Sequence, residues 1–247
     1  YEEVLGLHVR VIQGVAIDTR SADEVIQAID HAVEQHTSMN IAIANAHTVN
    51  LARESTRFKT LLAGFLVLND GAGVNLASKW KYGKSFCENL NGTDFTPRLL
   101  ANSTHSLRVF LLGARPDSVA AAFETLSKRY PQHQWLDYQD GYFSQADEDT
   151  VCSRIKQNSP DLLLVAMGNP LQEEWIARCS TKTGATICIG VGALFDFVSG
   201  RVERAPLWVR KLKCEWVFRL IQEPKRMWRR YLIGNLSFLR AMIGDRV

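Results

Sequence analysis

Short apolar runs alternate with helix-period segments along the first 200 residues of the chain. The apolar runs span residues 40–46, 65–69, 107–113, 161–168 and 185–192. The segments that follow the first four, at 48–63, 73–81, 115–130 and 170–179, mix polar and apolar residues at helical spacing. Short strands separated by helices of about 10–15 residues indicate βαβ units. The pattern therefore predicts an α/β fold with a mostly parallel, Rossmann-like sheet flanked by helices.

The pattern changes after residue 206, where no further strand-like run occurs. One apolar stripe has a residue every four positions, at Trp208, Leu212, Trp216 and Leu220. This spacing predicts a helix that packs its apolar face on the sheet. Pro224 ends the stripe, and residues 225–243 mix Arg with Trp, Tyr, Phe, Leu and Ile. That composition is typical of an interfacial amphipathic helix. The sequence therefore favours neither membrane contact nor packing on the sheet for this segment.

Charge is distributed unevenly along the chain. The formal net charge is only +3, but residues 201–247 carry twelve Lys and Arg against four Asp and Glu. Residues 1–200 therefore have a net charge of −5. A cationic segment on a mildly acidic body favours a polyanionic partner such as phosphates, nucleic acid or an anionic membrane. We predict a core domain over residues 1–200 and a basic amphipathic helical appendage over residues 201–247.

Length and cysteine usage restrict the class of protein. The chain has 247 residues, 46% of them apolar, which suits one large α/β domain or two small ones. No run approaches the roughly 18 apolar residues of a membrane span, and no signal peptide is evident. The five cysteines are odd in number and include no CxxC pair, which favours reduced cytosolic thiols over disulfides or a zinc site. The sequence begins with Tyr1 rather than Met, so whether it includes the native N-terminus is left open.

Polar residues and glycines follow several of the predicted strands. Asp70 comes directly after the run 65–69 and before Gly71. This position is typical of a turn, but it is also the carboxyl end of a strand, where open α/β sheets bind ligands. The sequence contains no GxGxxG and no GxxxxGK[ST] motif, which argues against a dehydrogenase and a P-loop NTPase. It also lacks the GxSxG motif typical of α/β-hydrolases.

The acidic triplet at residues 147–149, "DED", resembles the carboxylate pair that holds a metal in many sugar-nucleotide enzymes. Together with Ser144, however, these acids suit the first turn of a helix. The six histidines show no metal-ligand spacing. We therefore favour the helix-start interpretation and expect no metal site.

Six short stretches, together with their order along the chain, resemble the WecG/TagA/CpsF family of bacterial glycosyltransferases. They are "NDGAGV", "LLGARPDSV", "DGYF", "GNPLQEEWI", "GVGALFDFVSGRVERAP" and "EWVFRLIQEPKRMWRRY". The resemblance runs from about residue 14 to about residue 231. Together these stretches are far more specific than any one of them alone.

The resemblance implies a fold and an activity. Such enzymes transfer a sugar from a UDP-sugar to an undecaprenyl-diphosphate-linked acceptor at the inner, cytoplasmic face of the cell membrane. They act in the synthesis of teichoic-acid linkage units, enterobacterial common antigen or exopolysaccharide. They are inverting and metal-independent, use no cofactor, and have a Rossmann-like core of the GT-E type with a C-terminal appendage.

The resemblance also implies roles for individual residues. Asp70 takes the place of the catalytic base, and Asn45 lies where the family's pocket begins. Tyr142 and Asp196 fall at positions associated with the uridine, and Gln172 occupies the P-x-Q-E slot. The appendage arginines expected over the diphosphate are Arg219, Arg226 and Arg229.

Physical chemistry agrees with these roles, and two departures bear on the donor sugar. One carboxylate suffices as the base of an inverting transfer, and guanidinium groups can stabilise a leaving diphosphate in place of a metal. Leu171 and Asn89 stand where the family often has a Lys and an Arg. A sugar acid would favour an additional cation, so UDP-glucose and UDP-N-acetylmannosamine are preferred and remain equally open.

Two other functions compete with catalysis. A non-catalytic UDP-sugar-binding module would keep the pocket without needing Asp70. A nucleic-acid binder would use the basic, aromatic tail, but the polar residues at the strand ends would then be unexplained. We therefore expect no nucleic-acid partner, and whether the protein forms a homo-oligomer is left open.

Overall fold

The computed structural model describes residues 8–206, 215–222 and 224–245. In residues 215, 216, 219, 226, 227, 230 and 231 the description covers the backbone alone. Trp208 and Leu212, half of the predicted apolar stripe, lie outside the described residues.

A six-stranded sheet forms the centre of the molecule, with strand order β4-β3-β8-β7-β5-β6. All its neighbouring strands pair in parallel, which confirms the predicted α/β class. The strands are β3 (Met39–Ala44), β4 (Leu66–Asn69), β5 (Arg108–Gly113), β6 (Gln134–Gln139), β7 (Leu162–Ala166) and β8 (Ile187–Gly190). The pattern analysis missed β6 because this edge strand, QWLDYQ, is only half-buried and lacks an apolar run.

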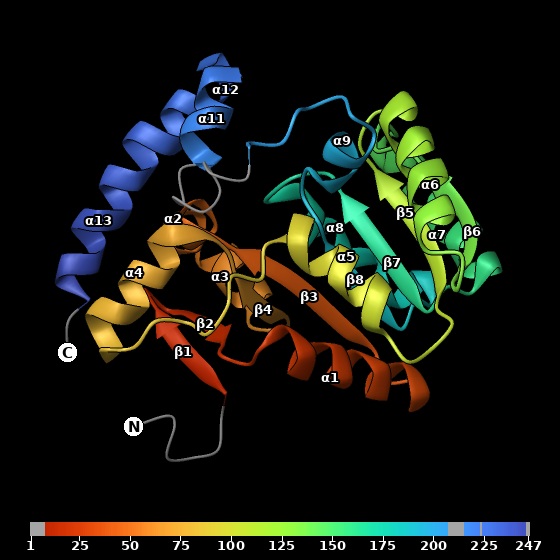
Figure 1. Ribbon diagram of the computed structural model, residues 1–247, viewed down its shortest axis with the longest axis horizontal. Helices are drawn as coiled ribbons and strands as arrows, with labels where there is room; N and C mark the ends of the chain where they lie inside the picture. The colour runs from red at the N-terminus through yellow and green to blue at the C-terminus, as the bar shows by residue number, and fades with distance from the viewer. Residues whose placement is uncertain (1–7, 207–214, 223, 246–247) are drawn as a thin grey trace.

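Helices cover both faces of this sheet (Figure 1). The helices α1 (Ala22–Glu34), α5 (Gly92–Asn102), α6 (Pro116–Arg129) and α9 (Leu194–Val198) share one apolar core with one face. The helices α2 (Ala46–Glu54), α3 (Thr56–Leu62), α4 (Gly71–Tyr82), α7 (Glu148–Asn158) and α8 (Leu171–Thr183) cover the other. In β7, Leu162 and Leu164 face the first core and Leu163 and Val165 the second. Burial on both sides explains why the strand sequences are continuously apolar.

Two local features differ from the expected pattern. The helix expected over 48–63 is divided at Ser55, whose backbone is extended and whose Oγ accepts a hydrogen bond from the Phe58 amide. Serine favours such a cap because its side chain satisfies an amide that the next helix leaves unpaired. A separate antiparallel hairpin, β1 (Val9–Ile12) and β2 (Val15–Asp18), was not expected.

The C-terminal segment is helical and partly docked on the core. It contains α11 (Glu215–Gln222), α12 (Pro224–Trp228), the π-helical turn η3 (Arg229–Ile233) and α13 (Gly234–Gly244). The Phe238 side chain of α13 is 1% exposed and belongs to the apolar core beneath α2 and α4. Asn50 of α2 donates to the Gly234 carbonyl at 2.7 Å. The division into a core and an appendage at residue 200 stays a prediction.

Membrane-spanning helices were also sought in the described part of the chain. None of its helices combines the length and the apolar character needed to cross a bilayer.

Replacing Phe238 by Ala tests the docking of α13. Truncating a buried Phe removes apolar contacts and leaves a cavity, so we expect the free energy of unfolding in urea to fall by about 3–5 kcal/mol. Leu236→Ala on the same helix is the control, because Leu236 is half-exposed. Equal losses in the two variants would show that Phe238 does not anchor α13.

Candidate functional site

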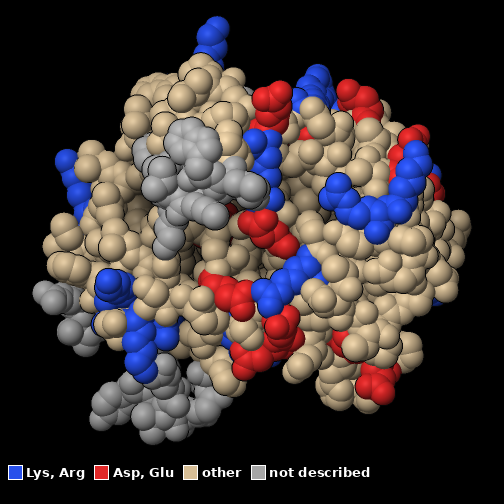
Figure 2. Space-filling model, in the orientation of Figure 1, with Lys and Arg blue, Asp and Glu red and all other residues tan. Residues whose placement is uncertain are grey.

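A cleft of about 1560 Å³ opens at the carboxyl ends of the strands. Residues that follow β3, β4, β5, β7 and β8 line it, as the ligand-binding edge of an open α/β sheet requires. Helix α13 closes one side with Asn235, Phe238 and Leu239. In the space-filling view the face is hollowed near its middle, and acidic and basic side chains lie side by side around the hollow (Figure 2).

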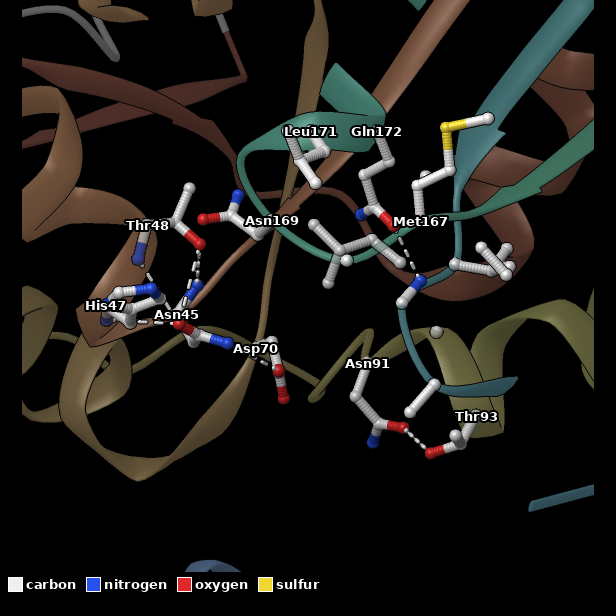
Figure 3. Close-up of a pocket in the computed structure, with 18 of the residues that line it drawn as sticks. Asn45, His47, Thr48, Asp70, Asn91, Thr93, Met167, Asn169, Leu171 and Gln172 are labelled. Atoms are coloured by element: carbon white, nitrogen blue, oxygen red, sulfur yellow. Dashed lines mark hydrogen bonds between the residues drawn. The ribbon is translucent and has the colours of Figure 1, made fainter. Parts of the chain in front are cut away.

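Asn45 and Asp70 follow neighbouring strands and meet in this cleft. Asn45 is the N-cap of α2, and its Oδ1 accepts hydrogen bonds from the amides of His47 at 3.0 Å and Thr48 at 3.3 Å. Its amide nitrogen donates to Oδ2 of Asp70 at 3.4 Å (Figure 3). Capping therefore fixes the side chain of Asn45 and directs its NH₂ group at the carboxylate.

Asp70 occupies the N-cap position of α4, yet its side chain makes no capping hydrogen bond. Instead Oδ1 of Asn89 accepts from the Gly71 amide at 2.7 Å. The backbone φ of Gly71 is +85°, a conformation that glycine adopts without strain. Asn89 thus takes over the capping role, and the Asp70 carboxylate lies in the cleft at a helix N-terminus, where negative charge is favoured.

Gln172 lines the cleft from α8, but both ends of its amide are engaged within the protein. It is 3% exposed. Its Oε1 accepts from the Gly192 amide at 3.0 Å, and its Nε2 donates to Oε1 of Glu173 at 2.8 Å. Gln172 therefore braces the start of α8 against the loop after β8.

Tyr142 and Asp196 line the same cleft. Tyr142, after β6, is 72% exposed, and its backbone amide donates to Oδ1 of Asp140 at 2.8 Å. Asp196 is half-buried within α9. The structure thus brings together Asn45, Asp70, Tyr142, Gln172 and Asp196, all five of the site residues predicted in the core.

Of the three predicted appendage arginines, the structure describes the side chain of Arg229. The side chains of Arg219 and Arg226 lie outside the described part of the structure. Arg229 does not line the cleft, and its guanidinium lies over the Trp228 ring, 5.3 Å from the ring centroid.

Four other arginines line the cleft, namely Arg57, Arg115, Arg178 and Arg201. Arg178 donates to Glu148 at 2.9 Å, and this hydrogen bond holds the pKa of the Glu148 carboxyl below its ordinary value. Arg201 lies 3.8 Å from Asp117. The strand-end pattern could indicate Arg115, but nothing local signals Arg57, which α3 brings to the cleft through tertiary packing.

Asn169 is a further cleft residue, which follows a predicted strand but had no predicted role. Both polar atoms of its amide are buried and have no hydrogen-bond partner among the described residues. It is the Asn of the stretch "GNPLQEEWI", and its residue type carries no functional signal by itself. A buried amide without a partner costs about 1–3 kcal/mol, so a ligand that bonds to it gains affinity.

The acidic triplet 147–149 is engaged in local contacts. Asp147 accepts from Ser144 Oγ at 2.6 Å, and Asp149 pairs with Lys182 at 2.8 Å. The predicted helix start is confirmed, because Ser144 and Asp147 form a capping box directly before α7. Over residues 8–206, 215–222 and 224–245, no group of three or more His, Cys, Asp or Glu is arranged to hold a metal ion.

The four cysteines within the described chain are free thiols. Burial raises the pKa values of Cys152 and Cys179, and it raises the pKa of Cys188 to about 12. These three thiols stay protonated at neutral pH and are poor nucleophiles. Cys214 lies outside the described residues.

Comparisons with known proteins give one matching family and several similar chains. The model of the glycosyl transferase WecG/TagA/CpsF family matches residues 9–247. An N-acetylglucosaminyldiphosphoundecaprenol N-acetyl-β-D-mannosaminyltransferase of Bacillus subtilis (strain 168) is 33% identical over 205 residues, covering 82% of this chain and 78% of its own. A protein of the same name from Staphylococcus aureus (strain MW2) is 34% identical over 224 residues, covering 88% and 86%.

Adding a methyl group at Gly190 tests the brace that Gln172 forms. A Cβ at Gly190 would lie 2.7 Å from Nε2 of Gln172, too close for an undisturbed contact. We expect Gly190→Ala to lower the free energy of unfolding by about 1–3 kcal/mol, as overpacking of a core does. Gly244→Ala is the control, since a Cβ there meets nothing within 4 Å, and its effect is expected to stay within about 0.5 kcal/mol. If both variants are as stable as the parent, the brace is not rigid.

Proposed function

The chain belongs to the WecG/TagA/CpsF family of glycosyltransferases, and from this premise we propose its substrates and mechanism. It transfers a sugar from a UDP-sugar to an acceptor linked to undecaprenyl diphosphate, as the names of its relatives indicate for their acceptor. The observation that carries the proposal is the placement of Asp70. Its carboxylate lies in the cleft, contacts Asn45 and is not consumed in capping α4.

Asp70 acts as the general base in this proposal. It takes the proton of the acceptor hydroxyl while that oxygen bonds to the anomeric carbon, and the bond from the anomeric carbon to the phosphate oxygen of UDP breaks. A single displacement inverts the anomeric configuration. Asn45 orients the carboxylate through the hydrogen bond from its amide to Oδ2.

Guanidinium groups stabilise the leaving diphosphate. Arg57, Arg115 and Arg201 line the cleft, and guanidinium groups bind phosphate oxygens in bidentate pairs. The appendage arginines Arg219, Arg226 and Arg229 complete this set when the segment closes over the bound substrates. We propose that the reaction needs no divalent cation, because these charges perform the task that a metal ion would perform.

The uridine binds between Tyr142 and Asp196, with Gln172 bracing the loop beneath it. For the transferred sugar, N-acetylmannosamine is favoured over glucose because the relatives are named as N-acetylmannosaminyltransferases. The uronic acid is less favoured, because Leu171 and Asn89 supply no cation where related chains often have one.

The experiment measures UDP release in EDTA from a panel of UDP-sugars with a lipid-diphosphate-linked acceptor. We expect transfer by the parent chain, and at least a hundredfold slower turnover for Asp70→Asn, because the amide cannot take a proton. The fold should be unchanged, since the Asp70 side chain does not cap α4.

Binding of UDP by Asp70→Asn is the control, and it should match that of the parent. Near-parental turnover in this variant would remove Asp70 from the mechanism. Binding of UDP-sugar by the parent without any turnover would favour the non-catalytic binding module. A requirement for Mg²⁺ or Mn²⁺ would contradict the role given to the arginines.

We further propose that the appendage holds the protein on the inner face of the cell membrane. Trp228 and Leu232 expose much of their apolar surface, and Lys225 and Arg229 are exposed beside them. Apolar side chains next to cations suit an anionic lipid surface.

Sedimentation with vesicles that contain anionic lipid tests this role. The double variant Lys225→Gln and Arg229→Gln should bind more weakly by about 2 kcal/mol, because each basic residue near the surface contributes about 1 kcal/mol. High salt should release the parent chain from the vesicles.

The matched control removes two exposed charges from α6, with Lys128→Gln and Arg129→Gln. This variant should bind vesicles like the parent. Equal losses in both double variants would mean that net charge, rather than the appendage, drives membrane binding.

A further inference from the structure

Helix α4 exposes two large apolar side chains one turn apart, and α13 exposes a similar pair in addition to Leu236. On α4 these are Leu76, 47% exposed, and Trp80, 40% exposed. On α13 they are Leu239, 38% exposed, and Ile243, 65% exposed. Residues four apart lie on the same face of a helix, so each pair forms a short apolar row.

The two helices run side by side in the same direction (Figure 1). Near their N-terminal ends, a Cβ at Gly73 would lie 3.6 Å from the ring of Phe238. At their C-terminal ends, Lys81 Nζ lies 3.2 Å from Asp245 Oδ1. Both contacts join residues at nearly the same position along the two parallel helix axes. Leu76 therefore lies beside Leu239, and Trp80 lies beside Ile243. We call these four residues the apolar strip.

The apolar strip begins inside the cleft. Leu76 and Leu239 line the cleft as well as the strip, whereas Trp80 and Ile243 lie outside it. Asp70 immediately precedes α4, and at 1.5 Å per residue Leu76 lies about 9 Å and Trp80 about 15 Å from it along the helix axis. The strip therefore leads from the neighbourhood of Asp70 toward the outside of the molecule.

We propose that the apolar strip binds the first isoprene units of the polyprenyl chain that carries the acceptor sugar. This inference rests on the proposed function, which places the acceptor hydroxyl at Asp70 and requires the attached lipid to leave the cleft. A narrow row of apolar side chains that starts at the cleft and runs outward fits a linear hydrocarbon. Exposed apolar surface of this kind commonly marks a binding site.

The shape of the strip argues against two other occupants. Four side chains are far fewer than the roughly 20–30 residues a side of a stable protein–protein interface, so a second copy of this chain fits poorly. A flat bilayer surface cannot reach Leu76 and Leu239 where they line the cleft. The ion pair of Lys81 and Asp245 follows directly after Trp80 and Ile243, so the strip is short and suits only the first isoprene units.

The test compares two acceptors that carry the same sugar diphosphate, one on a long polyprenyl chain and one on a short alkyl chain, in the same detergent. For the parent we expect a higher kcat/KM with the polyprenyl acceptor. We expect Trp80→Ser and Ile243→Ser each to lower the ratio of kcat/KM for the polyprenyl acceptor to kcat/KM for the alkyl acceptor about tenfold. This is the effect of losing one large apolar contact that the bound lipid buries. Ile221→Ser, which changes an exposed residue of α11, is the control and should keep the parental ratio.

A binding measurement without catalysis accompanies the assay. A short polyprenyl diphosphate that lacks the sugar should change the tryptophan fluorescence of the parent, and Trp80→Phe should lose most of this change. An unchanged kcat/KM ratio in both strip variants, with transfer intact in the parent, would overturn the strip as the lipid site. If the strip variants change their oligomeric state while the kcat/KM ratio stays unchanged, the strip would instead be an interface with a second copy of this chain. Absence of transfer by the parent to either acceptor would overturn the proposed function itself.

Discussion

A parallel sheet that is buried on both faces can carry polar side chains only at the ends of its strands. In this protein all residues from Leu162 to Ala166 in β7 are buried, and their side chains alternate between two apolar cores. A charge within such a strand would lack solvent and partners. In the central strands polar chemistry is therefore confined to the strand ends, and the parallel arrangement brings the carboxyl ends of all six strands to one edge.

Within that edge, helix capping decides which polar groups remain available. Asn45 caps its own helix and uses the rest of its amide to contact Asp70. Asp70 would cap α4 in the usual way, but Asn89 takes that place through the Gly71 amide. Position 89 thus carries the amide that caps α4. Because Asn89 fills the cap, the Asp70 carboxylate is released from it.

The C-terminal helix α13 links the cleft to the surface. Phe238 anchors it in the core, and the next residue, Leu239, reaches the cleft wall. One helix thereby stabilises the fold, closes a side of the site and supplies half of the apolar strip. The helices α11 and α12 precede α13 in the chain. The docking of α13 through Phe238 therefore restricts the positions that these helices and their arginines can take.

The sequence by itself determined the α/β class, five of the six sheet strands with the helices that follow them, and the positions of Asn45 and Asp70 after strands, because these depend on local periodicity. The family motifs added Tyr142, Gln172 and Asp196, which the structure places in the same cleft. Only the tertiary structure decided that Asn89 caps α4, that Gln172 braces a loop, and that Arg57 and Leu239 line the cleft. Each of these depends on contacts between residues far apart in the chain, whose partners no local pattern specifies.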